Sequence, residues 1–272
     1  MTWARSEAET SRLIVLPEVG STNDALAAID ADEADFTVVA TTSQTAGRGR
    51  LGRVWVAPPG KTLAVSVLLR PVLPGGAPLP VERFGWFPLI AGLAMTRAVS
   101  SLVPSTGAPR VGLKWPNDVQ VDGLKVSGLL AELLPGAGGG GGAVVLGAGL
   151  NLSIGADELP VPTATSLVLA GTTEPVADLA DLALSRYLVE LRQLVDGFLA
   201  SGADVAASGI HSAIESRCTT IGSDVRVQLP GGADLLGVAT GIDDTGRLLV
   251  RRGSDGAETA VAAGDVTHLR YE

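Results

Sequence analysis

Apolar residues recur along this chain with two different periods, which predict a mixture of strands and helices. Runs rich in β-branched residues predict strands at 36–42, 54–56, 62–69, 112–115, 119–121, 125–134 and 143–152. Helical spacing predicts helices at 21–29, 82–103 and 175–200, with a further helix ending near residue 216. Ser21 or Thr22 is the expected N-cap of the first helix, and Asp122-Gly123 is a hairpin signal.

The sequence changes character after Cys218. Short strands there are separated by turns at 230–232, 243–246 and 252–256, and this spacing is typical of a small closed β-barrel. We therefore expect two domains, a larger one at 1–217 and a small β-barrel at 218–272. The glycine run Gly138–Gly142 indicates a flexible tip that joins two antiparallel strands.

Length and composition limit the class of protein. The chain has 272 residues, 46% of them hydrophobic and 18% charged, so it can bury a real core and is not disordered. Its single cysteine excludes a disulfide framework and a cysteine-built metal site, and favours a reducing compartment. No signal peptide is visible, and Pro88 and Arg97 interrupt the most apolar stretch, 84–103. We expect a soluble cytoplasmic protein without a membrane partner.

Charge is distributed unevenly along the chain. The formal net charge is −9, which argues against general nucleic-acid binding. Residues 36–81 nevertheless contain no Asp or Glu and five basic side chains, namely Arg48, Arg50, Arg53, Lys61 and Arg70. The three arginines alternate with glycines and offer guanidinium and backbone N–H groups to one anion. That anion is a phosphate of a nucleotide or of a nucleic acid, and the acidic balance favours the small ligand. The alternative is a solvated basic loop.

Two nucleotide-binding patterns in this region are incomplete. Gly47-Arg48-Gly49-Arg50-Leu51-Gly52 has the glycine spacing of a Rossmann loop, but the residues that follow, ending in Pro58-Pro59, cannot begin the required helix. Gly60-Lys61-Thr62 resembles the end of a P-loop, but Trp55 stands where that motif needs glycine. A nucleotide site in this region would therefore be neither a Rossmann loop nor a P-loop.

Four motif segments combine in a fixed order. They are Ser21-Thr22-Asn23, then Gln44-Thr45-Ala46-Gly47-Arg48-Gly49-Arg50, then Lys114-Trp115-Pro116-Asn117-Asp118 with Lys125-Val126-Ser127-Gly128, and finally Gly147-Ala148-Gly149-Leu150-Asn151. Together they closely resemble the biotin protein ligases, or biotin–[acetyl-CoA-carboxylase] ligases. The resemblance implies an α+β fold like that of the class II aminoacyl-tRNA synthetases, with a mixed sheet packed by helices and a small SH3-like β-barrel at the C-terminus.

The resemblance implies an adenylate-forming ligase. Biotin and ATP would give biotinyl-5′-AMP and pyrophosphate, and the biotinyl group would pass to a lysine of the biotin carboxyl carrier domain of an acyl-CoA carboxylase. Mg²⁺ is the implied cofactor. Family members that also repress transcription carry an N-terminal helix-turn-helix domain. Ser21 lies too near the start to leave room for one, so we expect no DNA binding.

The family's functional residues match positions of this chain one by one. The implied biotin-binding residues are Ser21, Thr22, Asn23, Gln44, Gly47, Arg48, Gly49, Arg50, Lys125, Gly128 and Gly147. The implied ATP-binding residues are Arg50, Arg53, Trp55, Lys114, Asn117, Lys125 and Asn151. The implied catalytic residues are Lys125, Arg48, Lys114 and Asp118, with Asp118 also the implied ligand of Mg²⁺.

The chemistry of such a reaction suits these residue types. A biotin carboxylate is already ionised near pH 7, so no general base is needed. The obstacle is its repulsion by the α-phosphate, which fixed cations oppose. We expect Lys125 to bridge the two anions. The neutral ureido ring of biotin needs hydroxyl and amide partners. Trp55 either walls a ligand or belongs to the core. Asp118 either holds magnesium or orients the acceptor amine, and the sequence does not separate these roles.

Three rival functions stay open at this point. A lipoate or octanoate ligase of the related fold would share the mechanism and differ in its substrate. A non-enzymatic nucleic-acid-binding protein would use the arginine loop and the β-barrel, with an affinity that falls steeply with salt. A plain protein-interaction module would leave the acid-free basic segment unexplained.

Overall fold

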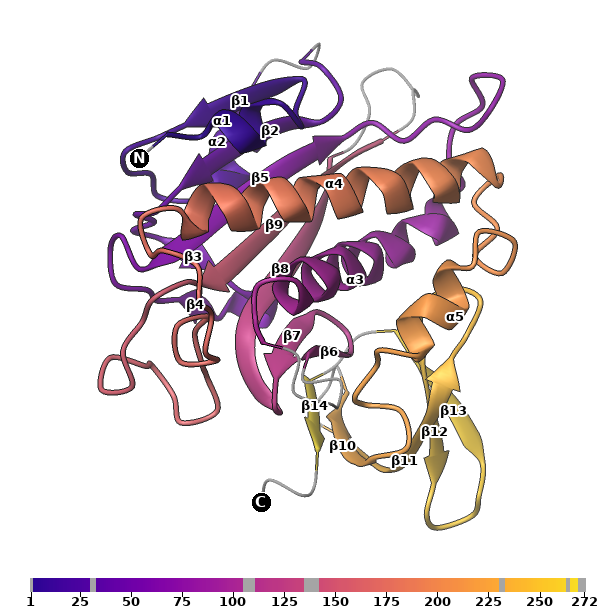
Figure 1. Cartoon of the computed structure of the whole chain (residues 1–272). Helices are drawn as coiled ribbons and strands as arrows, with labels where there is room; N and C mark the ends of the chain where they lie inside the picture. Colours follow the sequence, from indigo (N-terminus) through magenta and orange to yellow (C-terminus); the bar gives the residue numbers. More distant parts are fainter. Residues whose placement is uncertain are drawn as a thin grey trace.

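A seven-stranded mixed sheet organises the larger part of the chain (Figure 1). The computed structural model describes residues 2–29, 33–104, 111–134, 142–229, 233–262 and 265–268. The strands of this sheet lie in the order β1 (Arg12–Val15), β2 (Thr37–Thr41), β5 (Thr62–Leu69), β9 (Ala143–Asn151), β8 (Leu124–Leu134), β7 (Asp118–Val121) and β6 (Val111–Lys114). β1 and β2 are parallel, and every other pair of neighbours is antiparallel.

The two faces of the sheet carry different layers. The helices that cover them are α2 (Thr22–Ala27), α3 (Phe87–Ser100) and α4 (Leu179–Ala200). Along β5, Val65 and Val67 point into the main core under α3 and α4, which Figure 1 shows lying across one face. Leu68 points to the opposite face, where it packs with Leu26 of α2. The candidate site residues lie on this second face. The main apolar core and the candidate site are therefore on opposite faces of the same strands.

A buried carboxylate attaches the N-terminal segment to this helical layer. The short helix α1 (Ala4–Glu7) packs against α4. Asp181 of α4 is only 3% exposed, and its Oδ1 accepts hydrogen bonds from the backbone N and the hydroxyl of Ser6 at 2.9 and 2.7 Å. Because buried carboxylates are costly unless they are hydrogen-bonded, these contacts fix where α1 lies.

The C-terminal part forms a second sheet with antiparallel neighbours. Its strands lie in the order β13 (Glu258–Val261), β12 (Leu248–Arg252), β11 (Asp234–Ile242), β10 (Asp224–Gln228) and β14 (Asp265–His268). The short helix α5 (Ile210–Glu215) precedes it. Its buried side chains, such as Val225 and Val250, belong to the same apolar cluster as the core of the larger sheet. The two parts are therefore packed together.

The turn between β11 and β12 joins the two parts by hydrogen bonds. The indole N–H of Trp86 donates to the carbonyl of Asp244 at 3.0 Å, and that of Trp115 donates to the carbonyl of Gly246 at 3.1 Å. Gly246 has a φ of 86°, a conformation that favours glycine. Trp115 also belongs to the Lys-Trp-Pro-Asn-Asp motif, so this turn helps to set the position of that motif.

Most predicted elements are confirmed, and the differences concern two helices, two short elements that were not predicted, and one segment predicted without a strand. The region 82–103 begins as the 3₁₀ helix η2 (Val81–Trp86) before α3, and α4 begins at Leu179 instead of residue 175. α1 and β1 were not predicted, because four-residue elements show too little periodicity. The glycine- and arginine-rich segment 44–53, called here the Gly-Arg segment, was predicted to contain no strand. It contains the strand β3 (Gly47–Arg48), which pairs with β4 (Val54–Trp55) around the 3₁₀ helix η1 (Arg50–Gly52).

Two predicted connections can be compared with the structure. The hairpin at Asp122-Gly123 is confirmed: it joins β7 to β8, and both residues have positive φ, 51° and 81°, as a type I′ turn requires. The glycine run predicted to form a flexible tip lies mostly outside the described residues. The strands on either side of it, β8 and β9, are antiparallel as predicted, with Leu134 opposite Ala143.

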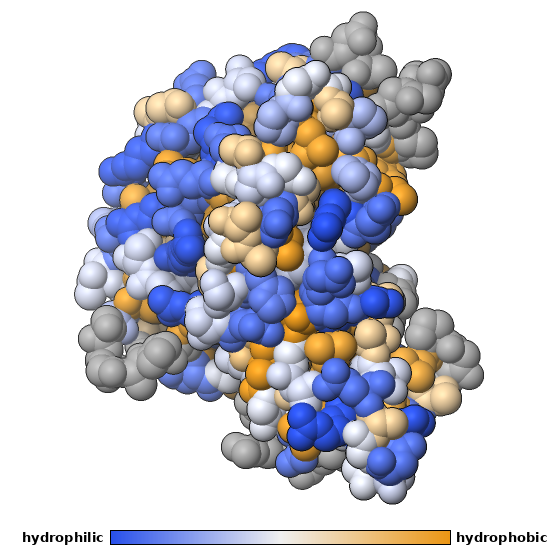
Figure 2. Space-filling view, turned by 90° about the vertical axis from the view of Figure 1, so that its right-hand side faces the viewer, coloured by the Kyte–Doolittle hydropathy of each residue, from blue (hydrophilic) through white to orange (hydrophobic). Residues whose placement is uncertain are grey.

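The surface is more polar than the interior. Figure 2 shows a face on which hydrophilic side chains are interspersed with small hydrophobic patches. Within the described ranges, none of the helices has the length and apolar character needed to span a membrane.

Candidate active site

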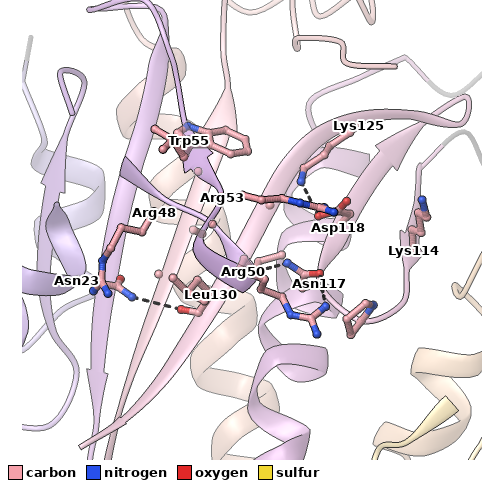
Figure 3. A pocket seen from close by; sticks show the side chains of 18 of the residues that line it. Asn23, Arg48, Arg50, Arg53, Trp55, Lys114, Asn117, Asp118, Lys125 and Leu130 are labelled. Atoms are coloured by element: carbon pink, nitrogen blue, oxygen red, sulfur yellow. Dashed lines mark hydrogen bonds and ion pairs between the residues drawn. The ribbon is translucent and has the colours of Figure 1, made fainter. Parts of the chain in front are cut away.

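A cavity of about 540 Å³ opens on the α2 side of the large sheet. It brings together most residues that the sequence predicted for a ligand site: Ser21, Thr22, Asn23, Gln44, Arg48, Gly49, Arg50, Arg53, Trp55, Lys114, Asn117, Asp118, Lys125, Gly128 and Gly147. These come from α2, the Gly-Arg segment, β6 to β8 and β9. Figure 3 shows Asn23 and Arg48 at one end of the cavity and Lys114 and Asp118 at the other.

Two predicted residues do not line this cavity. Gly47 lies behind the wall, where a Cβ would fall 2.6 Å from Gln44 Nε2 and 2.7 Å from the Trp55 carbonyl oxygen. Its missing side chain lets these two residues approach. Asn151 is buried at the end of β9, and its side-chain amide donates to the carbonyl of Thr165 at 2.8 Å. Its predicted contact with ATP stays a prediction.

One end of the cavity is built from neutral polar groups. Gln44 Oε1 accepts from the backbone N of Thr22 at 2.9 Å and from its hydroxyl at 3.2 Å. Ser66 Oγ, on β5 behind the wall, lies 2.8 Å from the Thr22 hydroxyl and 2.6 Å from Asn23 Oδ1. Ser21 caps α2 through its hydroxyl, which accepts from the backbone N of Asp24 at 3.4 Å. Hydroxyls and amides of this kind recognise neutral ligand groups.

A glycine makes room for this neutral end. A Cβ on Gly147 would lie 2.2 Å from Asn23 Oδ1. β9 places Gly147 directly opposite Ser66 of β5 on one side and Leu130 of β8 on the other. Asn23 thus lies flat on the sheet, in a position that a side chain at 147 would block.

The opposite end is strongly basic. The described residues that line the whole cavity include six basic side chains, Arg48, Arg50, Arg53, Lys114, Lys125 and Arg226, and two acidic ones, Asp118 and Asp234. Of the basic ones, Arg48 lies at the neutral end (Figure 3), where Asp24 and Glu132 pair with it. Lys125 Nζ lies 2.7 Å from Asp118 Oδ1. Lys114 stands opposite Asp118 in the β6–β7 register, so two lysines flank one carboxylate. This excess of positive charge is suited to a polyanion.

The backbone holds Lys125 in place from both sides. Its N donates to the carbonyl of Thr163, and its carbonyl accepts from the N of Thr165, both at 2.8 Å. A register shift between β7 and β8, next to Gln120, breaks the regular ladder at this point. Such irregularities re-aim side chains, and here Lys125 Nζ is directed toward Asp118 and lies 5.5 Å from the centre of a Trp55 ring.

Trp55 forms an aromatic wall against the sheet. A Cβ on Gly149 would lie 2.7 Å from Trp55 Cε2, and one on Gly128 would lie 3.2 Å from Trp55 Cζ3. These glycines let the indole approach the strands. Trp55 therefore lines the cavity, whereas Trp115, which also lines it, is 2% exposed and is mainly a core residue.

The Gly-Arg segment is closed over the cavity by polar contacts. Arg48 Nη2 donates to Asp24 Oδ1 at 2.6 Å and to Glu132 Oε2 at 2.9 Å. Arg50 Nη1 donates to Asn117 Oδ1 at 3.2 Å, and the Asn117 amide N donates to the carbonyl of Leu129 at 2.8 Å. The two arginines therefore attach this segment to opposite parts of the cavity wall.

Burial changes the proton affinity of two of the cations. It lowers the pKa of Lys114 from its ordinary value, Lys125 and Arg53 lower it further, and Asp118 opposes the shift. Burial also lowers the pKa of Arg50, with a further contribution from Arg53 and an opposing one from Asp118. Placing cations here therefore costs free energy, as is common at functional sites.

The described residues do not form a cage for a resident metal ion. Nowhere in these ranges do three or more His, Cys, Asp or Glu side chains gather as metal ligands. Asp118 is the carboxylate at the basic end, and it is paired with Lys125. One carboxylate suits a cation such as Mg²⁺, which is bound by one or two carboxylates together with substrate phosphates.

The sequence did not predict two sets of residues at this site. Arg226, Gln228 and Asp234 line the cavity from β10 and β11, and only the packing of the second sheet brings them there. Ser66 and Glu132 contact the neutral end from behind. Both lie on strands that were predicted correctly, where each polar side chain interrupts an apolar run, and that interruption is the signal that could have found them.

Comparisons with known proteins agree with this geometry. Residues 17–151 match the Biotin/lipoate A/B protein ligase family, and residues 220–269 match the Biotin protein ligase C terminal domain. A biotin–[acetyl-CoA-carboxylase] ligase of Mycobacterium tuberculosis is 41% identical over 95% of this chain and 90% of its own length. The bifunctional ligase/repressor BirA of Escherichia coli is 30% identical over 88% of this chain and 68% of its own length.

A solved structure shows the same arrangement of the chain. The biotin protein ligase from Aquifex aeolicus in complex with biotin and ATP superposes with a TM-score of 0.68 at 26% identity, covering 94% of this chain and 98% of the other. The similarity extends over both sheets.

Proposed function

Because this chain belongs to the biotin protein ligase family, we propose that it is an ATP-dependent biotin–protein ligase. In this proposal it activates biotin as biotinyl-5′-AMP, with release of pyrophosphate. The amine of an acceptor lysine then attacks the carbonyl carbon, and an amide bond forms as AMP leaves and the amine gives up a proton. The name of the similar protein from Mycobacterium tuberculosis supports acetyl-CoA carboxylase as the acceptor.

The observation that carries the proposal is the division of the cavity into a neutral and a basic end. Biotin has a neutral ureido ring at one end and a carboxylate at the other. The hydroxyl and amide groups around Asn23 suit the ring. The lysines that flank Asp118 suit the carboxylate and the phosphates of ATP. One cavity therefore offers suitable partners to both parts of the molecule and to the nucleotide that activates it.

The chemistry of activation assigns roles to the basic residues. The carboxylate oxygen attacks the α-phosphorus, and the bond to the pyrophosphate leaving group breaks, so no proton has to be removed. Two anions must approach closely, and their repulsion is about 4 kcal/mol for unit charges 4 Å apart at an effective dielectric near 20. We propose that Lys125 bridges the two anions, while Arg48, Arg50 and Lys114 stabilise the developing charge.

Trp55 and the closed Gly-Arg segment have a second role in this proposal. An acyl-adenylate reacts with water, so the site must exclude water until the acceptor lysine arrives. Arg48 and Arg50 attach the segment to two sides of the cavity. Trp55 covers the strands below it. The segment would thus retain the intermediate as well as help to form it.

Several finer points belong to the same proposal. We propose that Mg²⁺ binds with ATP, held by Asp118 and the phosphates, where it would neutralise phosphate charge. We propose the biotin carboxyl carrier domain of an acyl-CoA carboxylase as acceptor, a cytoplasmic location, a division near residue 217, and closure of the second sheet into an SH3-like β-barrel. The net charge of −9 supports the absence of DNA as a partner.

Exchange of labelled pyrophosphate into ATP tests the proposed first step. We expect exchange that depends on biotin, with Mg²⁺ present, and none with lipoate or octanoate in parallel reactions. Exchange with lipoate in place of biotin would keep the mechanism and change the substrate. Folded protein that gave no exchange with any of the three acids would refute the ligase proposal.

A further inference from the structure

Glu132 stands behind the neutral end of the cavity without lining it. It lies on β8, and its side chain is 32% exposed. Its Oε2 accepts a hydrogen bond from Asn23 Nδ2 at 2.6 Å and another from Arg48 Nη2 at 2.9 Å. One carboxylate oxygen thus contacts both the helix that carries the polar wall and the segment that closes over it.

This carboxylate fixes the orientation of the Asn23 amide. An ionised carboxylate can only accept hydrogen bonds, so the NH₂ group of Asn23 must face Glu132. The amide oxygen then faces Ser66, whose Oγ lies 2.6 Å away. The reversed amide would place its oxygen against the carboxylate, which is repulsive. The Leu130 carbonyl, 3.5 Å from Asn23 Nδ2, favours the same orientation more weakly, so Glu132 at 2.6 Å provides the main constraint on which face of this amide donates and which accepts.

The hydrogen-bonding direction that Glu132 sets at Asn23 also affects the neighbouring polar side chains, Ser66 and Thr22. Asn23 Oδ1 cannot donate, so the single hydroxyl proton of Ser66 points to it. Ser66 then has only lone pairs left for the Thr22 hydroxyl, 2.8 Å away. Thr22 in turn must donate, either to Ser66 or to Gln44 Oε1 at 3.2 Å. The carboxylate at the end of the row thus sets the directions at Asn23 and Ser66 and leaves the Thr22 hydroxyl a choice of two acceptors.

We propose that Glu132 is a positioning residue that fixes the hydrogen-bonding direction of the wall that receives the ureido ring of biotin. This inference rests on the proposed function. A ureido group has one strong acceptor and two donors, so a wall with mixed orientations would offer the wrong partner part of the time. An effect of Glu132 through Asn23 should fall on biotin binding, whereas an effect through Arg48, its other partner, would fall on adenylation as well.

Glu132→Leu is the informative substitution, because leucine has a similar size and presents no acceptor to Asn23 or Arg48, whereas a glutamine oxygen could still accept both hydrogen bonds. We expect calorimetry without ATP to show an increase in the Kd for biotin of about tenfold or more. The KM for biotin in the exchange reaction should rise by the same factor, while kcat and the KM for ATP stay within about twofold. Glu132→Asp should recover part of the lost affinity.

Two controls separate this role from others. Glu158 has a similar exposure, 36%, and an ion pair with Lys61 away from the cavity, so Glu158→Leu should leave all constants unchanged. Asp24 also contacts Arg48 but makes no side-chain contact with Asn23 among the hydrogen bonds of the described residues. Asp24→Leu should therefore weaken biotin binding less than Glu132→Leu does. An equal effect would show that Glu132 acts through Arg48, and would overturn the proposal.

Ser66→Ala provides a second, independent variant on the same row of hydrogen bonds. If Glu132 acts through Asn23 and Ser66, the effects of E132L and S66A on the Kd for biotin will not add in the double variant. Additive effects, or an unchanged Kd in folded E132L, would refute the positioning role. Failure of the wild-type protein to catalyse any exchange would instead refute the proposed function, so the two failures are distinguishable.

Discussion

Gly147→Ala tests whether the neutral end of the cavity depends on close approach between α2 and β9. A Cβ at this position would lie 2.2 Å from Asn23 Oδ1 and 2.9 Å from Asn23 Cγ. Nonbonded heavy atoms are comfortable at about 3.5 Å, so Asn23 would have to retreat by roughly 1.3 Å. Gly147 is not among the glycines with positive φ, so steric contact alone decides the result.

Asn23 has little freedom to retreat. It is buried, and its amide is held at 2.6 Å by Ser66 on one side and at 2.6 Å by Glu132 on the other. If Asn23 stays, the crowding costs about 1–3 kcal/mol. If it moves, its hydrogen bonds are lost, which also costs about 1–3 kcal/mol. We therefore expect G147A to lose about 1–3 kcal/mol of stability and to bind biotin at least tenfold more weakly.

Urea unfolding and biotin calorimetry measure the two effects. The midpoint should fall at an unchanged m-value, which indicates a loss of native stability. Gly197→Ala in α4 is the matched control, because a Cβ there meets nothing within 4 Å. It should be neutral or stabilising by about 0.5–1 kcal/mol, as expected for alanine in a helix. If G147A behaved like G197A in both measurements, the argument from close approach would be refuted.

Three further predictions concern charge and buried polarity. Lys125→Ala should lower the rate of adenylation by a factor of about 10²–10³ without unfolding the protein; a folded variant with the wild-type exchange rate would refute the assignment. Lys114→Gln should lower activity yet stabilise the ligand-free protein at pH 7. Denaturant titrations should show that this difference in stability between the variant and the wild type shrinks as pH rises toward the ordinary lysine pKa. The reason is that burial lowers the pKa of Lys114 in the folded wild type. The folded protein therefore loses this proton at a lower pH than the unfolded chain, and the wild type gains stability as pH rises. Tyr187→Phe should be neutral or stabilising by up to about 1 kcal/mol in thermal unfolding, since the Tyr187 hydroxyl is buried without a hydrogen-bond partner in the described structure; a clear loss of stability would show an unrecognised partner.

The elements that the sequence predicted well are those with strong patterns. β5 and β9 are long apolar runs buried on both faces, and the Asp122-Gly123 turn has residues that tolerate positive φ. α1 and β1 are short, and tertiary contacts define them, as the bonds from Ser6 to Asp181 show for α1. Their partners lie far away in the chain, where local periodicity has no information.

The candidate site was predictable wherever a motif keeps its residues close together in the chain. Lys114 and Asp118 are only four positions apart in the sequence, and they stand opposite each other in the pairing of β6 with β7. Glu132 is different, because its partner Asn23 is 109 positions away in the chain. Arg226 reaches the cavity only through the packing of the second sheet. Asn151 shows the converse: its side chain bonds to the Thr165 backbone, outside the cavity lining.

The face of β8 and β9 under the cavity explains how one sheet can be both stable and functional. Gly128 stands directly opposite Gly149, and Gly147 opposite Leu130, so the floor of the cavity is mostly bare backbone. A Cβ at any of these glycines would meet Asn23, Trp55 or Lys125. Glycine weakens a strand, since it contributes no side chain to pack. The opposite face offsets this weakness, because Leu146, Leu150 and their neighbours there belong to the main core. The glycines can therefore serve the ligand on one face because the apolar residues between them hold the sheet together on the other.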